Sequence, residues 1–334
     1  MVSSDDIAQH LDGLAKPPGS LGKLESLAAR LAVTQGTLKP QTKPRKLLIF
    51  AGDHGVVVEG VGLWPSAVTA AMIGVIASGR ASCSALAASS GTPVALIDVG
   101  SQIATAPAGK IYTDARVARG SANLAQVPAL TPGQFWAAWT VGEAAMNAAA
   151  KDGCKVVALG EIGIGNTTAA ACLVALIAQA DPDLVVGAGA GSTLETLAKK
   201  RLVVAEAVER AIEYVSSDPV TAMASVAGYE IVAMAGAIAA AAHADVTVVL
   251  DGVVSAAAAL IAASVDPAAL ETAIASHVGS EPAHAIALEK LALEPFLDWQ
   301  LRLGEGTGAL LLLPMLDAAA NLLSGVATLK EVAG

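Results

Sequence analysis

Short runs of β-branched residues alternate with longer Ala- and Leu-rich stretches along most of the chain. The short runs have the length and residue types of buried strands, and the long stretches have the length of covering helices. We predict strands at Lys46–Ala51, Pro93–Val99, Lys155–Leu159, Val246–Leu250 and Thr272–Ser276. We predict helices at Ser66–Ser89, Pro132–Ala150, Thr167–Gln179, Thr193–Val215, Tyr229–Ala242, Val253–Ala263, Pro282–Leu291 and Gly308–Leu323. This order predicts an α/β fold, a doubly wound and mostly parallel sheet with helices on both faces, and ligands beyond the carboxyl ends of the strands.

The residues before the first predicted strand follow a different pattern. Ile7–Leu14 and Leu21–Thr34 are predicted helices on either side of the proline- and glycine-rich segment Lys16–Gly22. We expect residues 1–40 to form a small helical domain that helices from the C-terminal end complete. Residues 41–334 are then expected to form a Rossmann-like catalytic domain.

Composition supports a folded chain with a large core. Of its 334 residues, 54% are hydrophobic and 32 are glycine, which excludes a disordered protein and allows one large or two unequal domains. The 20 Lys and Arg against 30 Asp and Glu give a net charge of −10. Without a basic cluster interleaved with aromatic residues, we expect no nucleic acid partner.

Two uncharged stretches, Gly60–Gly79 and Ile162–Ala180, have the length of a membrane span. The first contains Pro65, and the second contains the polar run Asn166 to Thr168, so buried core is the better interpretation and no membrane partner is expected. The first ten residues carry acids where a signal peptide has bases. Cysteines without paired spacing indicate reduced core thiols, and histidines without a ligand pattern predict no metal. We therefore expect a cytoplasmic protein.

Two turns after predicted strands carry residues suited to chemistry. Ala51–Val56 places Asp53 and His54 between glycines, where the pair could hold a substrate or simply form a turn. Leu159–Thr168 is glycine-rich and leads into a helix, so its amides and polar side chains could cradle a phosphate. The alternative is a tight turn with a threonine cap.

Two further turns lie closer to the C-terminus. Val186–Ser192 contains three alternating glycines and is followed by the cations of residues 199–201, which could reach a phosphate or form a solvated basic patch. Arg302–Ala309 places Glu305 between two glycines at the start of a predicted helix. An apolar ligand that buries this carboxylate would make it a stronger general base, whereas the alternative is an ordinary acid at a helix N-terminus.

These turns and several other segments resemble one known family, the nicotinate-nucleotide:dimethylbenzimidazole phosphoribosyltransferases. The resemblance covers nearly the whole chain, and the matching segments follow the family's order. They are Leu14–Gly22, Gly52–Gly55, Gly160–Thr168, Gly228–Gly236, Leu250–Gly252, Ser276–His277 and Arg302–Gly306.

The resemblance implies transfer of the phosphoribosyl group of nicotinate mononucleotide to 5,6-dimethylbenzimidazole or a related base. The products are α-ribazole 5′-phosphate, for the lower ligand of cobalamin, and nicotinate. It also implies a homodimer without a cofactor, with Glu305 as the catalytic base and Glu161 as a second catalytic acid residue. The residues implied for the mononucleotide are Gly163, Gly165, Asn166, Thr167, Gly189, Lys200, Ser280 and Arg302.

The chain departs from the family pattern in three places. Gly187–Gly191 reads Gly-Ala-Gly-Ala-Gly where the family usually has Gly-Arg-Gly-Thr-Gly, and Gly279–Glu281 reads Gly-Ser-Glu where Ser-Ala-Glu is usual. Near the base, Gly62, Ala71 and Val75 replace a usual Ser, Gln and Asn. These changes predict a more apolar base pocket that accepts other benzimidazoles or phenols, because shape alone discriminates weakly. Its predicted walls are Leu63, Met72, Val75 and Met315.

Two other functions remain as alternatives. The altered Gly187–Gly191 turn is compatible with a non-catalytic nucleotide-binding paralogue. Glycine-rich turns after strands also occur in Rossmann-type oxidoreductases, although a GxGxxG sequence with an acid about 20 residues later is not convincingly present.

Overall fold

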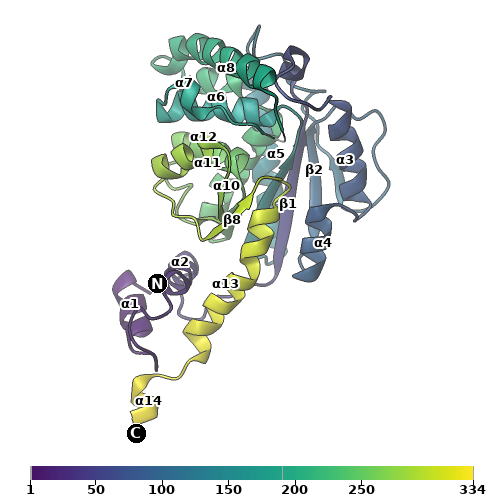
Figure 1. Cartoon of the computed structure of the whole chain (residues 1–334). Coiled ribbons are helices and arrows are strands. Elements are labelled where there is room, and N and C mark those ends of the chain that lie inside the picture. Colours follow the sequence, from purple (N-terminus) through teal and green to yellow (C-terminus); the bar gives the residue numbers. More distant parts are fainter. Residues whose placement is uncertain (1, 190, 334) are drawn as a thin grey trace.

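Strands β1 (Arg45–Gly52) and β4 (Val156–Ile162) lie side by side at the centre of a six-stranded parallel sheet (Figure 1). The computed structural model describes residues 2–189 and 191–333. The other strands are β2 (Val94–Gly100), β3 (Tyr112–Asp114), β5 (Thr247–Leu250) and β6 (Ala273–Ala275), in the spatial order β3-β2-β1-β4-β5-β6. The direction of winding reverses between β1 and β4, which places the binding crevice of such folds at their carboxyl ends.

All five predicted strands are confirmed, with ends shifted by up to three residues. The prediction omitted three short strands: β3, and the separate parallel pair β7 (His277–Gly279) and β8 (Leu297–Leu301). β8 is short and largely exposed, and Asp298 and Gln300 interrupt its apolar residues, so it lacks the continuous apolar run of a buried strand. The α/β, mostly parallel fold class is confirmed.

The ten predicted helices are all present among the described residues, although one of them is divided in two, and the prediction omitted three short helices at Pro182–Val185, Pro219–Val226 and Leu329–Ala333. The single helix predicted at Ser66–Ser89 is two helices, because Gly79 adopts a left-handed conformation with φ +74° that ends the first one. The helices are α1 (Ser4–Asp12), α2 (Lys23–Gln35), α3 (Ala67–Ala77), α4 (Ser82–Ser89), α5 (Pro132–Lys151), α6 (Asn166–Ala178), α7 (Pro182–Val185), α8 (Leu194–Val215), α9 (Pro219–Val226), α10 (Tyr229–His243), α11 (Val253–Val265), α12 (Pro282–Lys290), α13 (Thr307–Gly325) and α14 (Leu329–Ala333).

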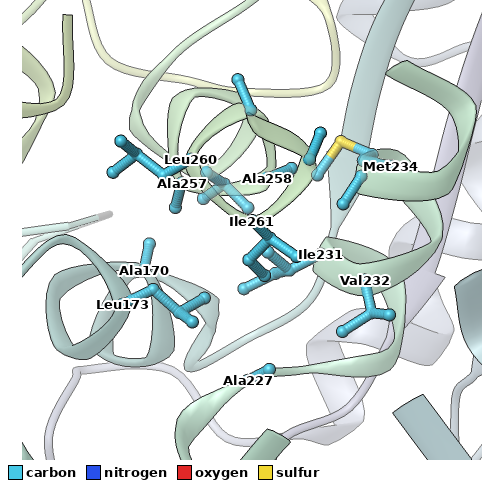
Figure 2. Close-up of a cluster of buried hydrophobic side chains, with 14 of the residues drawn as sticks. Ala170, Leu173, Ala227, Ile231, Val232, Met234, Ala257, Ala258, Leu260 and Ile261 are labelled. Carbon is cyan, nitrogen blue, oxygen red and sulfur yellow. The ribbon is translucent and has the colours of Figure 1, made fainter. Parts of the chain in front are cut away.

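Alternate residues of β1 enter two separate hydrophobic cores, one on each face of the sheet. Leu48 and Phe50 join the core that α5, α6, α10 and α11 complete, part of which Figure 2 shows. Leu47 and Ile49 join the second core, which α2, α3, α4 and α13 cover. Burial on both faces explains why the strands are continuous apolar runs.

Helices α5 and α10 pack so closely that their contact requires glycine. A Cβ atom at Gly142 would lie 1.7 Å from the carbonyl oxygen of Ala233, and one at Gly236 would lie 2.2 Å from that of Trp139. The small residues that enrich this chain therefore allow the helices to approach backbone to backbone and hold the sheet rigidly behind the crevice.

The two ends of the chain pack against one another away from the sheet, where α1, α2, α14 and the end of α13 lie together (Figure 1). Leu14 forms an antiparallel bridge with Thr328, and His10 Nε2 lies 2.8 Å from the carbonyl oxygen of Leu323. The N-terminal helices thus make extensive contacts with C-terminal segments.

Two helical stretches among the described residues are long and apolar enough to cross a membrane by length and composition alone. They are Ala67–Ser89 and Thr307–Gly325. The first consists of α3 and α4 with the exposed Arg80 in the turn between them. The second is α13, which contributes many side chains to the second core.

Candidate active site

A cavity of about 460 Å³ lies at the carboxyl ends of β4, β5 and β6. It brings together turns that are far apart in the sequence, as expected for a crevice at the reversal of strand order. All ten residues predicted for catalysis and nucleotide binding line it: Glu161, Gly163, Gly165, Asn166, Thr167, Gly189, Lys200, Ser280, Arg302 and Glu305.

One end of the cavity has the features of an anion site. The glycine turn after β4 leads directly into α6, whose N-terminal amides provide positive potential. The buried ammonium of Lys200 donates to Thr167 Oγ1 and to the carbonyl oxygen of Gly187, both at 3.0 Å. Burial lowers the pKa of Lys200, and the charge of Glu281 opposes that shift. A phosphate would find a cation, a hydroxyl and helix amides at this end.

The Val186–Ser192 turn is held in place by Glu281. Glu281 Oε1 accepts the backbone N–H of Gly189 at 2.8 Å, and both residues line the cavity. Ala190, one of the replaced positions of this turn, lies outside the described residues. The turn therefore reaches the cavity although it lacks the usual Arg and Thr.

Glu161, at the end of β4, is a half-buried carboxyl group in the wall of the cavity. Burial raises its pKa to about 8, and the nearby carboxylates of Asp251, Glu230 and Glu305 act in the same direction. The side-chain amide of Asn166 donates to Glu161 Oε2 and opposes the shift. At neutral pH, the carboxyl group of Glu161 is therefore mainly protonated.

Glu305 precedes α13 and is 4% exposed, with its side chain at the cavity. The backbone N–H of Cys83, in the first turn of α4, donates to Glu305 Oε2 at 3.4 Å. Glu305 and Glu161 thus form a pair of carboxyl groups in one cavity, one mainly protonated and one held by a backbone donor. Such a pair suits proton transfer.

Another part of the cavity lining is apolar, with walls from the segment before α3 and from α3 itself. Leu63 and Met72, both predicted for the base pocket, line it with Val61, Trp64 and Val68. Gly62 is also at the wall.

Val75 and Met315 do not line this cavity, so the structure does not bring these two predicted pocket walls together with Leu63 and Met72. Val75 lies nearly a turn beyond Met72 on α3 and packs against the second core. Met315 is eight positions into α13, about 12 Å from the start of that helix at 1.5 Å per residue, and its side chain is 43% exposed.

Asp53 and His54 lie behind the cavity rather than in it. Both residues are 1% exposed, and His54 Nε2 lies 2.6 Å from Glu230 Oε1 on α10. Asp53 accepts the backbone N–H of Gln102 at 2.7 Å. The turn after β1 therefore supports the fold, and its two polar side chains do not line the cavity, which favours the plain turn over the substrate site that the sequence left open.

His277 and Glu281 line the cavity but were not among the predicted site residues. His277 Nδ1 lies 2.9 Å from Ser276 Oγ, and burial lowers the pKa of its ring. For His277 the signal was the segment Ser276–His277, which resembles the family and directly follows a predicted strand. For Glu281 the signal was the segment Gly279–Glu281, whose final glutamate agrees with the usual Ser-Ala-Glu of the family.

Among the described residues, no group of three or more His, Cys, Asp and Glu side chains has the arrangement of a metal site.

Comparisons with known proteins identify the class of enzyme to which this chain belongs. A family model described as a phosphoribosyltransferase matches residues 2–333, so the chain is a phosphoribosyltransferase. Proteins named nicotinate-nucleotide–dimethylbenzimidazole phosphoribosyltransferase also match over nearly the whole chain. The one from Solidesulfovibrio magneticus is 38% identical over 96% of this chain and 90% of its own length, and the one from Salinispora tropica is 41% identical over 94% and 90%.

A crystal structure of CobT from Thermus thermophilus has a TM-score of 0.95 to this chain at 39% identity, and the match covers 99% of this chain and 98% of that one. A second structure from that organism, described as the dimethylbenzimidazole phosphoribosyltransferase, has a TM-score of 0.93. The chain belongs to the nicotinate-nucleotide–dimethylbenzimidazole phosphoribosyltransferase family.

Proposed function

We propose that this enzyme transfers the phosphoribosyl group of nicotinate mononucleotide to 5,6-dimethylbenzimidazole or a related base. The products are α-ribazole 5′-phosphate, for the lower ligand of cobalamin, and nicotinate. The observation that carries this proposal is that one cavity combines anion-binding groups, apolar walls and a pair of carboxyl groups.

The mononucleotide phosphate is assigned to the anion-binding end. Lys200 and Thr167 supply a charge and a hydroxyl, and the turn with Gly163 and Gly165 supplies backbone amides at the start of α6. Asn166 and Gly189 complete the inner surface, while Ser280 and Arg302 are exposed at its rim.

The chemistry requires one base. The nicotinate ring leaves as a neutral pyridine nitrogen, because the electron pair of its broken bond to C1′ of the ribose cancels the pyridinium charge. A ring nitrogen of the azole forms the new bond to C1′, and the proton on the azole's other nitrogen must leave. Glu305 is the proposed acceptor of that proton, and the protonated Glu161 is the proposed hydrogen-bond donor beside it.

The acceptor base is assigned to the apolar lining of the cavity. Met72, Leu63, Val68 and Trp64 offer hydrophobic contact there, and Gly62 contributes no side chain. Recognition by shape separates bases that differ by a methyl group by only about 1–3 kcal/mol, so benzimidazoles other than the dimethyl form are expected substrates.

We propose a homodimer in the cytoplasm as the working form. Large apolar side chains are exposed near the mouth of the cavity, Leu63 at 51% and Leu303 at 58%, and Met315 is exposed on α13. Apolar surface of this kind is typical of contacts between subunits. Sedimentation analysis at several protein concentrations tests the dimer, and a monomer at all of them would contradict it.

The function is tested by incubating the protein with nicotinate mononucleotide and separate benzimidazoles, purines and phenols. Nicotinate and new ribotides are measured by mass spectrometry. A benzimidazole ribotide formed in equal amount with nicotinate supports the transferase. Mononucleotide binding without any product would instead support the non-catalytic paralogue, which the replaced Arg and Thr of the Gly187–Gly191 turn make the second candidate.

A further inference from the structure

The backbone around Glu305 has a conformation that ordinary side chains rarely adopt. Three consecutive residues are left-handed, Gly304 with φ +87°, Glu305 with φ +58° and Gly306 with φ +75°. A left-handed glutamate costs conformational energy, so such a turn persists only where neighbouring groups hold it. The surroundings of Glu305 therefore contain contacts that fix the turn.

Asp251 supplies these contacts on the backbone side. This buried carboxylate follows β5 and is 2% exposed. Its Oδ2 atom accepts the N–H of Gly306 at 3.0 Å, while Oδ1 accepts the N–H groups of Gly308 at 2.7 Å and Ala309 at 3.3 Å. One side chain thus binds the residue after Glu305 and the first turn of α13 together.

Cys83 supplies contacts on the carboxylate side. Besides its backbone hydrogen bond to Glu305 Oε2, its thiol lies close enough to the same carboxylate to donate to it. Burial raises the pKa of the thiol to about 12, and the charge of Glu305 adds to that shift. The thiol is therefore protonated at working pH and acts as a donor.

We propose that Asp251 and Cys83 are the positioning residues of Glu305, Asp251 for its backbone and Cys83 for its carboxylate. This inference rests on the proposed role of Glu305 as the base. The titratable groups near Glu305 are Cys83 from α4 and Glu161 from β4, whose pKa values its charge raises. Asp251 binds the backbone of the same turn, and His277 Nδ1 lies 3.9 Å from Asp251 Oδ1. A pH profile of the rate reports on this group of residues.

The Cys83 contact is tested with Cys83→Ala and Cys83→Ser. Alanine removes the thiol and keeps the backbone donor, and serine restores a side-chain donor. We expect Cys83→Ala to lower kcat about 3- to 10-fold, with an unchanged KM for nicotinate mononucleotide, because one hydrogen bond is lost. Serine is expected to restore kcat, which a merely structural role of the thiol would not require.

Cys172→Ala is the matched control. Cys172 is equally buried, but it lies on α6 in the other core and its contacts do not include Glu305. The control is expected to keep the parent kcat and pH profile. A Cys83→Ala variant with parent kinetics, or one indistinguishable from Cys172→Ala, would overturn the role of Cys83.

Asp251→Asn tests the backbone contact. Its amide oxygen can still accept from Gly308 and Ala309, but its amino group faces the N–H of Gly306 without bonding it. We expect kcat to fall about 100-fold with mononucleotide affinity retained, the size of effect that a misplaced reacting group produces. A folded Asp251→Asn enzyme with kcat within about twofold of the parent would overturn the role of Asp251.

Glu305→Gln separates failure of this inference from failure of the proposed base. If Glu305→Gln abolishes turnover while the Cys83 and Asp251 variants retain it, only the positioning roles fail. If Glu305→Gln keeps the parent kcat, the base assignment itself is wrong. Should Asp251→Asn not fold, as shown by its melting curve, the Cys83 series decides the carboxylate contact and the backbone contact is tested with Asp251→Glu.

Discussion

Lys200 Nζ lies 3.0 Å from Thr167 Oγ1 and thereby joins α8 to the first turn of α6. This contact fixes a buried cation beside the helix amides that face the cavity. It gives the anion-binding end a charge even though the Gly187–Gly191 turn lacks its usual arginine.

Replacing Lys200 by methionine keeps much of the side-chain volume and removes the charge. We expect the affinity for nicotinate mononucleotide to fall about 10- to 100-fold, the worth of a charged hydrogen bond. Isothermal titration calorimetry measures it. Lys199→Met is the control, because Lys199 is exposed and pairs with Glu195 at 3.0 Å. Equal affinities of Lys200→Met and Lys199→Met for nicotinate mononucleotide would contradict the assignment of the phosphate to Lys200.

The raised pKa of Glu161 predicts a pH-dependent stability. Burial moves this pKa from the usual 4.5 to about 8 in the folded protein. Between these values the folded state binds more protons than the unfolded state, so the contribution of this group to stability is full below pH 4.5 and is lost as pH rises through about 8. Glu161→Gln removes the effect. The melting temperature of Glu161→Gln should therefore rise relative to that of the parent as pH rises from 4.5 to about 8. A difference in melting temperature that stays constant over this range would contradict the raised pKa of Glu161.

The pair formed by His54 and Glu230 predicts a large loss of stability on mutation. Burial lowers the pKa of His54, but the charge of Glu230 and the hydrogen bond to it outweigh burial and raise the pKa overall. Removing one member leaves the other buried and unpaired, so Glu230→Ala should lower the free energy of unfolding by about 3–5 kcal/mol. Urea denaturation measures it. Glu195→Ala, which breaks an exposed pair, should cost no more than about 1 kcal/mol.

The position of the cavity walls predicts which residues affect base selectivity. Met72→Ala should change the ratio of kcat/KM for dimethylbenzimidazole and benzimidazole, because Met72 lines the cavity. Val75→Asn and Met315→Ala should leave the ratio within about twofold, since neither residue reaches it. Competition assays with both bases measure the ratio. A strong effect of Val75→Asn would place the base elsewhere.

The predicted strands and the turns after them were correct because buried parallel strands are apolar runs that end in glycine and polar residues. Glu305 was a candidate because it lies between glycines at the start of a predicted helix, whereas Glu161 was implied by the family resemblance, and both line the cavity. The direction of a helical side chain was harder to predict. Met72 and Val75 are three residues apart on α3, yet only the first lies at the cavity, because the second is nearly a turn further along the helix.

The buried polar contacts were not predictable from sequence, since they join segments far apart in the chain. Asp53 and His54 follow a strand as a site residue does, but α10 covers them through Glu230. Asp251 contacts residues 55 or more positions away, and Cys83 contacts a residue 222 positions away. No local pattern reports such pairs.

The central claim is that Glu305 removes the proton of the incoming base. The most direct measurement compares turnover of the parent and Glu305→Gln with nicotinate mononucleotide and dimethylbenzimidazole, together with mononucleotide affinity. Loss of a general base is worth about 10²- to 10⁴-fold in rate. The account predicts a loss of that size with affinity within about twofold of the parent. Turnover of Glu305→Gln at the parent rate would contradict it.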